Sequence, residues 1–498
     1  MSDKSIAIIG AGIGGLSTGI FGRINGFRTT IFEQHTIPGG VAAAWKRKGF
    51  LFDGGIHFLM GADPGTDTDE LYRTLGIVPQ TETVEMETFC RYVDQATGRS
   101  IDITSDLDRF VRDVAGISSQ DAAIFEELVR ASRSFRDIDL MAGLRDAPGL
   151  QSFIDKLKTF WGMRSIGRYM AGKWNADMRT YSQRAADPFC RFVLQNLFLP
   201  QVPVWFVLML LGYLAGRNMH LLAKGSLSFA RDIESRYKEL GGGLHYKSMV
   251  ERIIVESDRA IGVKLADGTE HRADYVVSAA DGYSTIFRLL DGKYSDPKIR
   301  GRYDSWDLMD PIMTVSFGVD GGYGEHPWLH IIRLAEPFKA GQSWVESICT
   351  RLFNYNTNFA PAGKTSFVTM LETDWQSWND LAKDRPAYDA AKQQVADAVA
   401  KALDERFPGF ADAIEAADVA SPVTWHRYTL NHRAAYEGFL PTPLAISETI
   451  ERRLPGLDNF YMAGQWVVPG GGVPPTLFTG RHAVQLVCSD DGRKFRGK

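Results

Sequence analysis

The sequence predicts an α/β protein that opens with a parallel strand, a glycine-rich turn and a helix. The segment Ser5–Ile9 is apolar and isoleucine-rich, which is typical of a buried parallel strand. It runs directly into a glycine-rich turn at residues 10–15. Glycine is also in excess over the whole chain, with 49 in 498 residues against a usual fraction of about 7%. The positions of the glycine clusters are therefore the main guide to function.

The composition is that of an ordinary globular protein. Apolar residues make up 44% and charged residues 23% of the chain, which excludes a disordered, collagen-like or coiled-coil protein. The formal net charge of −4 provides no basic field, so we expect no nucleic-acid partner. A chain of this length buries about three quarters of the surface that its unfolded form exposes, so a large core is expected.

The cysteines are widely spaced and form no Cys-x-x-Cys pair, so neither a metal site nor a disulfide framework is predicted. They are Cys90, Cys190, Cys349 and Cys488. The N-terminal residues lack the features of a signal peptide. The longest apolar run, 202–215, is shorter than the about 20 residues of a membrane-spanning helix. We therefore expect a protein of the reducing cytoplasm.

The first glycine cluster has the spacing Gly-x-Gly-x-x-Gly between a strand and a helix. At such a turn Gly10 permits the tight bend, Gly12 lets backbone approach a pyrophosphate, and Gly15 lets helix and strand pack closely. A second strand, at residues 29–32, ends at Glu33, whose carboxylate can accept hydrogen bonds from ribose hydroxyls. The whole pattern predicts a dinucleotide site. An acid at Glu33 argues against a 2′-phosphate, which leaves FAD or NAD.

Two further glycine clusters stand near the first motif and near the C-terminus. Residues 38–41 contain paired glycines, and residues 49–58 alternate apolar and small side chains as a β-ribbon does. Residues 454–464 have the pattern of a strand, and 469–475 form a Pro-Gly-Gly-Gly-Val-Pro-Pro turn. A helix is predicted from there, at about 476–487. Its N-terminus would present the positive end of its dipole to a bound cofactor.

These clusters resemble those of the flavoprotein superfamily that contains phytoene desaturases, carotenoid isomerases, retinol saturases and monoamine oxidases. The C-terminal turn is similar to the signature of the phytoene desaturase type. The resemblance implies FAD, with the paired glycines along its pyrophosphate and the segment at Asp53 beside the flavin ring. It also implies that the last helix points at the flavin O2/N1 edge, where it would stabilise the anionic reduced flavin. Val41 departs from the basic or polar residue that often follows the paired glycines.

The middle of the chain also has a family-like stretch. A helix begins at 224–227 and ends at the glycines 241–243, and strand patterns follow at 249–255, 261–265 and 273–281. The resemblance implies that Val250 contacts adenine through its backbone and that the strand end at Ala279 and Ala280 passes the dinucleotide.

The domain organisation follows from these positions. We expect a Rossmann-type FAD-binding domain that is discontinuous and consists of residues 1–75, 224–300 and 445–498. Residues 76–223 and 301–444 would form an α+β substrate domain. The resemblance implies that this second domain has an antiparallel sheet as its floor and helices as its roof.

Local patterns predict elements of the substrate domain. Ser105 with Asp108, and Ser118 with Asp121, have the spacing of capped helix starts. Pro386 begins a further helix that is stopped by a Pro-Gly pair at 408–409. Two more segments, 312–319 and 365–371, alternate like strands of a sheet.

The candidate cofactor-binding residues lie at the glycine clusters and at the strand ends beside them. They are Gly10, Gly12, Ile13, Gly14, Gly15, Glu33, Gln34, Gly39, Gly40, Val41, Asp53, Gly54, Gly55, Val250, Ala279, Ala280, Gly464, Val473 and Pro474. His57 is the candidate catalytic residue. Its Gly-Ile-His-Phe context resembles the Gly-Ile-His-Tyr of retinol saturases more than the Gly-Pro of phytoene desaturases. An acid/base role and a hydrogen-bonded supporting role both fit this histidine.

A flavin needs no triad and no metal, because it can itself accept a hydride or assist double-bond isomerisation. We therefore expect an FAD-dependent enzyme that desaturates, saturates or isomerises a long apolar substrate, of isoprenoid or carotenoid type as the resemblance implies. An amine oxidase is one alternative. Another is a non-catalytic prenyl-lipid chaperone of the GDP-dissociation-inhibitor type, which has lost its FAD contacts. The single dinucleotide motif leaves oxygen or a quinone as the electron acceptor.

Residues 189–222 are unusually apolar, which fits a buried helical roof, a tunnel lining or a patch that rests on a membrane. Basic and aromatic residues alternate just upstream. The basic residues are Lys156, Lys158, Arg164, Arg168, Lys173, Arg179, Arg184 and Arg191, the aromatic residues are Phe160, Trp161 and Trp174, and Met163 and Met170 lie among them. Such a mixture suits an anionic bilayer, so we expect peripheral contact with the inner face of a membrane.

Overall fold

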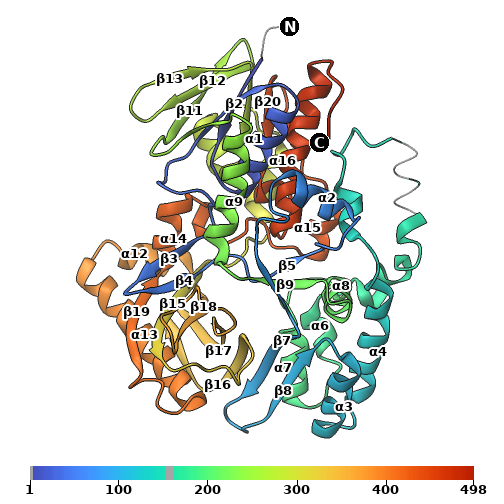
Figure 1. Ribbon diagram of the computed structural model, residues 1–498, viewed down its shortest axis with the longest axis vertical. Coiled ribbons are helices and arrows are strands. Elements are labelled where there is room, and N and C mark those ends of the chain that lie inside the picture. Colours follow the sequence, from blue (N-terminus) through green and yellow to red (C-terminus); the bar gives the residue numbers. More distant parts are fainter. Residues whose placement is uncertain (1–3, 153–156, 158–160) are drawn as a thin grey trace.

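A computed structural model of the chain describes residues 4–152, 157 and 161–498. The upper half of the molecule in Figure 1 is built on a parallel five-stranded sheet with the order β10-β2-β1-β14-β20. Its strands are β1 (Ser5–Ile9), β2 (Arg28–Phe32), β10 (Gly243–His245), β14 (Tyr275–Ser278) and β20 (Phe460–Met462). In this sheet Ile8 pairs with Ile31 on one side and Val277 on the other. Strands that lie far apart in the sequence thus end at one edge of the sheet.

Helices cover one face of this sheet, and a small antiparallel sheet covers the other. The helices are α1 (Ile13–Ile24), α9 (Gly225–Glu239) and α16 (Val473–Asp490), and the small sheet contains β11 (Val250–Glu256), β12 (Arg259–Leu265) and β13 (Glu270–Arg272). The helices α1 and α16 cross closely, because a Cβ atom on Gly480 would lie 2.7 Å from the Gly14 carbonyl oxygen. This arrangement brings the N-termini of two helices to the same edge of the parallel sheet.

The lower half of the molecule is built on a seven-stranded mixed sheet with the order β19-β15-β18-β17-β16-β7-β8. Its strands are β7 (Thr88–Asp94), β8 (Ser100–Thr104), β15 (Ile312–Asp320), β16 (Leu329–Ala340), β17 (Ser343–Leu352), β18 (Lys364–Glu372) and β19 (Ile414–Ala420). All neighbours are antiparallel except β7 and β16. The long helix α13 (Arg385–Arg406) packs on this sheet through Val395, Val399 and Leu403.

Further helices form an apolar cluster beside the sheet, seen at the lower right of Figure 1. They are α3 (Leu107–Ile117), α4 (Ala122–Ser132), α6 (Met178–Ser182), α7 (Pro188–Gln195) and α8 (Val204–Ala215). The remaining helices and strands are short. They are α2 (Asp67–Thr74), α10 (Gly282–Ser284), α11 (Pro297–Ser305), α12 (Trp375–Leu381), α14 (Pro422–Thr429), α15 (Pro443–Ser447), β3 (Ala44–Arg47), β4 (Phe50–Asp53), β5 (Leu59–Met60), β6 (Thr83–Glu85) and β9 (Met219–Leu222). In the part of the chain that the structure describes, no helix is long and apolar enough to cross a membrane.

The α/β class that the sequence predicts is confirmed, and several local predictions need correction. The ribbon predicted at 49–58 is a strand only over β4, which pairs with β3. The predicted N-terminal caps of two helices are also wrong. Asp106, rather than Ser105, caps α3, because its carboxylate accepts the Arg109 amide at 2.9 Å. Ser118 does not cap α4, because the helix begins only at Ala122 and the Ser118 hydroxyl donates to the Asp121 carboxylate at 3.0 Å. Asp121 stands at the N-cap position, but its carboxylate accepts the amides of Ala186 and Asp187 instead of an amide of the helix. The boundaries of the two expected domains stay a prediction.

Candidate active site

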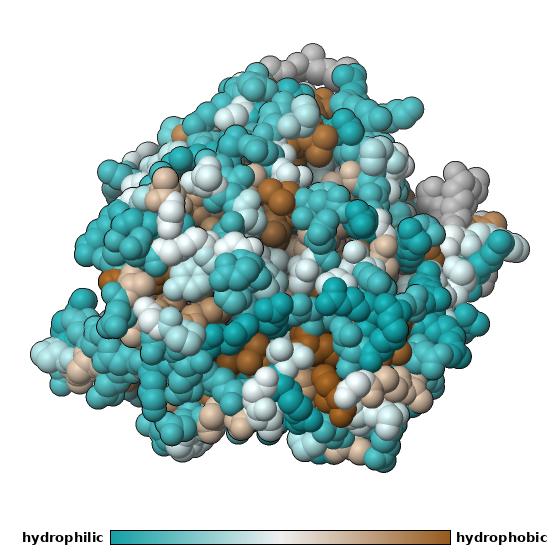
Figure 2. Space-filling model, turned by 60° about the horizontal axis from the view of Figure 1, so that its bottom comes forward, coloured by the Kyte–Doolittle hydropathy of each residue, from teal (hydrophilic) through white to brown (hydrophobic). Residues whose placement is uncertain are grey.

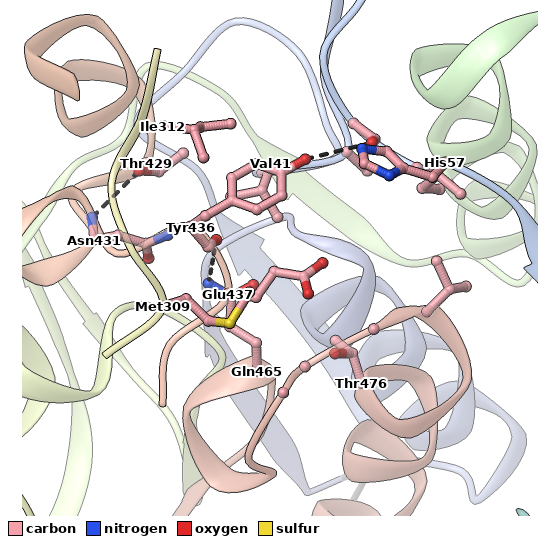
Figure 3. Close-up of a pocket in the computed structure, with 18 of the residues that line it drawn as sticks. Val41, His57, Met309, Ile312, Thr429, Asn431, Tyr436, Glu437, Gln465 and Thr476 are labelled. Carbon is pink, nitrogen blue, oxygen red and sulfur yellow. Dashed lines mark hydrogen bonds between the residues drawn. The ribbon is translucent and has the colours of Figure 1, made fainter. Parts of the chain in front are cut away.

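A cavity of about 710 Å³ lies between the two halves and reaches from the ends of the parallel strands to the lower sheet. Ligands of open parallel sheets bind beyond the carboxyl ends of the strands, which is where this cavity begins. Figure 3 shows residues of the lower sheet, the loops between the halves and the start of α16 around one pocket. The cavity has a glycine-lined end and an apolar end.

The glycine-lined end exposes bare backbone from two loops. Gly12 precedes α1, and a Cβ atom built on it would meet no atom within 4 Å. The Gly39 amide donates a hydrogen bond to the Ala11 carbonyl at 3.0 Å, which holds the second loop beside the first. Gly40 is so close to Gly12 that a Cβ atom on it would lie 3.4 Å from the Gly12 Cα. The two loops thus form a narrow cradle beside a helix N-terminus, which suits a pyrophosphate.

Glu33 closes one side of this cradle at the end of β2. Its Oε2 accepts the Ala11 amide at 2.7 Å, and its Oε1 accepts the His35 amide at 2.8 Å. The residue is 8% exposed and lines the cavity. Each carboxylate oxygen has two acceptor positions, so both oxygens could still accept a ribose hydroxyl.

The N-terminus of α16 forms the other side of this end. Gly470, Gly471 and Gly472 all have positive φ, which glycine adopts readily. Because Pro474 and Pro475 lack an N–H group, Val473 carries the only backbone donor among the first three residues of the helix. This helix therefore acts on a bound group through its dipole more than through a set of amide donors.

Most of the predicted cofactor-binding residues line the cavity. They are Gly10, Gly12, Ile13, Gly14, Glu33, Gln34, Gly39, Gly40, Val41, Gly55, Val250, Ala279, Ala280, Gly464, Val473 and Pro474. Gln34 also donates through Nε2 to the Tyr428 carbonyl at 2.9 Å. Gly15 lies outside the lining, where a Cβ atom would come within 2.0 Å of the Gly10 carbonyl oxygen. Its role is close packing of α1 against the turn.

Asp53 and Gly54 also lie outside the lining, in contrast to the position beside the flavin ring that the resemblance implies. The Asp53 carboxylate is buried and accepts hydrogen bonds from the Gly55 amide, the Ser226 amide and the Ser226 hydroxyl at 2.6–3.0 Å. Burial raises its pKa, which the positive charge of Arg351 opposes. Asp53 thus fixes the turn that leads to the cavity residues Gly55 and His57.

His57 lines the cavity, and its Nε2 lies 3.1 Å from the Met370 sulfur. Burial holds the pKa of the imidazole well below its usual value, and the charge of Arg351 lowers it further. Arg351 is itself 1% exposed and donates from Nη2 to the Asp53 carbonyl at 2.5 Å. The histidine is therefore neutral at neutral pH.

Sequence reasoning missed two residues at the centre of the cavity. The Tyr436 hydroxyl donates to the Gly54 carbonyl at 2.8 Å, which joins the lower half to the His57 turn. Next to it, the Glu437 side chain extends into the pocket, between Tyr436 and Thr476 in Figure 3. Burial raises the pKa of Glu437 to about 7. A single glutamate at one position of the sequence carries no local signal, so only the fold could reveal that Glu437 faces the cavity.

Large apolar side chains line the far end of the cavity. They are Phe58, Phe89, Met141, Leu197, Leu199, Phe198, Phe206, Met209, Leu210, Leu329, Ile331, Ile348 and Met370. Most of the predicted apolar stretch 189–222 is buried core, so the helical-roof interpretation explains it, while part of α8 and the preceding loop line the cavity. Trp344 also lines the cavity and is 64% exposed, so the cavity opens to the surface beside β17.

Comparison with known proteins supports this geometry. The family model of flavin-containing amine oxidoreductases matches residues 13–488. A prolycopene isomerase of Arabidopsis thaliana is 23% identical over 514 residues, which cover 99% of this chain and 84% of that protein. A lycopene-forming phytoene desaturase of Pseudescherichia vulneris is 22% identical over 523 residues, which cover 98% of this chain and 99% of that protein. Among solved structures, cyclohexylamine oxidase of Brevibacterium oxydans has a TM-score of 0.61 at 14% identity, covering 99% of this chain and 100% of that one. The last likeness concerns the fold alone.

Proposed function

Because the chain belongs to the family of flavin-containing amine oxidoreductases and is an FAD-dependent oxidoreductase, we propose that it acts on carbon–carbon double bonds of a long apolar isoprenoid substrate. The observation that carries the proposal is the single cavity with a bare-backbone end and an end lined by aliphatic and aromatic side chains. Relatives named as a prolycopene isomerase and a phytoene desaturase support the substrate class. Desaturation, saturation and cis–trans isomerisation remain the three candidate reactions.

The residues at the glycine-lined end fit FAD. We assign the ribose hydroxyls to Glu33, the pyrophosphate to the cradle of Gly12 and Gly40, and the adenine to the backbone at Val250. The flavin ring would lie toward the N-terminus of α16 at Val473. When bound, FAD accepts or returns a hydride. The chain itself orients the substrate, excludes water through its apolar lining and holds protons.

The same cavity also bears on the two alternative functions, the prenyl-lipid chaperone and the amine oxidase. A prenyl-lipid chaperone needs no cradle, whereas this chain keeps Gly10, Gly12, Gly15 and Glu33. An amine oxidase has the same fold, and carboxylates such as Asp310 and Glu372 also line this cavity, but aliphatic and aromatic side chains make up most of its far end. A charged or hydrogen-bonding amine gains little from such a lining, and a polyene gains much.

Peripheral membrane contact is a further part of the proposal. Leu150, Leu157 and Trp161 are 40%, 45% and 56% exposed, and the Arg164 guanidinium lies over the Trp161 ring. Lys156, Lys158 and Phe160 of the expected basic and aromatic set lie outside the described residues. Two other members, Lys173 and Arg184, pair with Glu127, so they contribute less charge to a bilayer. On the face drawn in Figure 2, hydrophobic residues gather in separate patches among hydrophilic ones.

Purified protein tests the proposed function directly. Mass spectrometry of apolar compounds extracted from it should find an isoprenoid, and its visible spectrum should contain a flavin. Added phytoene should be desaturated with oxygen or a quinone as acceptor, or added prolycopene should be isomerised without net electron transfer. Rapid reduction of the flavin by cyclohexylamine or putrescine, with no reaction of either polyene, would favour the amine oxidase. A colourless protein that still binds isoprenoid would favour the chaperone.

Liposome flotation tests the membrane contact. The protein should float with anionic vesicles at low salt, and Trp161→Glu should reduce the bound fraction because it places a charge in the exposed apolar segment. Trp344→Glu, at the opening of the cavity, is the matched variant with a similarly exposed tryptophan. Absence of binding by the unmodified protein would remove this part of the proposal.

A further inference from the structure

We propose that the carboxyl group of Glu437 is the proton carrier of the cavity, which gives a proton to the substrate or takes one from it. This inference rests on the proposed function for its substrate, since adding or removing hydrogen across a double bond moves a proton as well as a hydride. It assigns an acid/base role to a residue other than the predicted His57.

The backbone around Glu437 is held from two sides. Pro311 forms a bridge with Ala435, and the Met309 amide donates to the Gly438 carbonyl at 2.8 Å. On the other side, a Cβ atom on Gly471 would lie 3.1 Å from the Glu437 Cβ. With backbone on both flanks, the side chain extends into the cavity, where Met309, Gln465 and Thr476 surround it in Figure 3.

The carboxyl group has no hydrogen bond or ion pair with any residue that the structure describes. A carboxylate without a partner is costly away from water, so the neutral acid is favoured there. Its remaining exposed surface faces the cavity rather than open solvent, because Glu437 is one of the lining residues and its pKa shift is that of a desolvated group. Bound cofactor and substrate would remove that remaining contact with water.

The raised pKa of Glu437 is caused by burial and not by a charged neighbour among the described residues. Tyr436 is neutral, because burial raises the pKa of its hydroxyl. On the neighbouring segment, Asp307 and Asp310 interact with each other, and across the cavity His57 is neutral. The turn and helix start at 465–476 bring no titratable side chain. With a pKa of about 7, the group can both release and accept a proton at neutral pH, which is the condition for efficient acid/base catalysis.

The two other titratable candidates are less suitable. His57 is disfavoured as the proton carrier, because burial and the charge of Arg351 lower the pKa of its imidazole well below the usual value. Glu372 also has a pKa raised by burial to about 7, with Asp310 raising it further and Arg179 opposing. However, Glu372 lines the cavity from the last residue of β18 in the lower sheet, near Asp310, whereas Glu437 stands beside the N-terminus of α16, toward which the flavin ring is assigned.

The reaction balances with one proton and one hydride. In a desaturation, one C–H bond would break and its hydrogen would leave with the electron pair as a hydride, for which bound FAD would be the acceptor. The neighbouring C–H bond also breaks; its electron pair forms the new π bond and its proton goes to the Glu437 carboxylate. Saturation is the reverse. In an isomerisation, the Glu437 proton adds to one polyene carbon and is removed after bond rotation, so no net oxidation occurs.

The test compares Glu437→Gln with Glu437→Asp, and uses Glu336→Gln as the control. Glu336 is exposed and paired with Lys401, which holds its pKa below the usual value. Turnover of phytoene or prolycopene should fall by about 100-fold or more in Glu437→Gln. Deuterium transfer from D₂O into the recovered polyene should fall in parallel. Glu437→Asp should recover part of both, Glu336→Gln should retain both, and all variants should keep the flavin spectrum.

Infrared spectroscopy gives a readout that needs no substrate. The carbonyl band of a protonated carboxyl group should titrate near pH 7 in the unmodified holoprotein, and Glu437→Gln should remove it. Glu372→Gln should remove a different component and leave the Glu437 band. If the unmodified protein shows no such band, or if Glu437→Gln keeps full turnover and deuterium transfer, the inference is wrong. If the band is present but neither polyene reacts, the proposed function fails while the protonated Glu437 stands.

Discussion

The two ends of the cavity are built in different ways. The glycine-lined end is made of backbone from short local turns, such as residues 10–15 and 470–472, with few side chains. The apolar end is made of side chains from β7, β16, β17, α8 and the loops between them. Backbone surfaces of this kind follow from local sequence, whereas the apolar end exists only once distant segments have packed. The cofactor is therefore easier to predict than the substrate.

The largest expected effect lies at the junction of the two ends, where Arg351 of β17 contacts the Asp53 turn. Arg351→Met should lower the free energy of unfolding by about 4 kcal/mol, because it leaves the Asp53 carboxylate buried without the nearby cation. It should also raise the pKa of His57, since the charge of Arg351 lowers it. Denaturant unfolding and NMR titration of the histidine measure the two effects.

The double variant with Asp53→Asn is the control for Arg351→Met. With the carboxylate removed, the loss of the arginine charge should matter less, and the double variant should be more stable than the sum of the single losses implies. Additive losses would mean that Asp53 and Arg351 act independently, and the junction would then be no more than two separate buried groups.

The second prediction concerns the backbone end alone. Gly15→Ala should cost about 3 kcal/mol of stability, because the added Cβ would lie 2.0 Å from the Gly10 carbonyl oxygen and α1 would have to move. Gly12→Ala should fold normally, since the same atom there meets open space, but it should weaken FAD binding. Thermal unfolding and flavin retention separate the two. Equal instability of both variants would contradict the division between packing and ligand-facing glycines.

The sequence could predict much of the cofactor end and little of the apolar end, for physical reasons. Gly10, Gly12 and Glu33 lie within one strand–turn–helix unit, where spacing fixes position. The resemblance places the segment at Asp53 beside the flavin ring, but it does not say which side chains of the segment face the cavity: Gly55 lines it, while the Asp53 carboxylate turns to Ser226. Glu437 was missed because its surroundings come from residue 309 and from the turn at 471, which are distant in sequence.

The third prediction uses the pH dependence of stability to test the cavity carboxyl group. The pKa of Glu437 is raised from 4.5 to about 7 on folding, so the folded state retains a proton that the unfolded state releases. Its contribution is therefore complete below about pH 4.5 and is lost as the pH rises to about 7. Glu437→Gln should lack this decline and should be about 2 kcal/mol more stable at pH 8. Denaturant unfolding at pH 5 and pH 8, with equal FAD, measures the difference.

The smallest expected effect tests whether a helix start in the lower half of the molecule can be predicted from local sequence. The α3 cap is far from the cavity and depends on one carboxylate, so Asp106→Ala should cost about 1 kcal/mol through loss of the hydrogen bond to the Arg109 amide. Ser105 is the cap that the sequence predicts. Ser105→Ala should cost a few tenths of a kcal/mol at most, because the Ser105 side chain does not cap α3. Neither variant should change the flavin spectrum or turnover. A reversed order would place the cap one residue earlier and would show that the helix start, unlike the cavity, could be predicted from spacing alone.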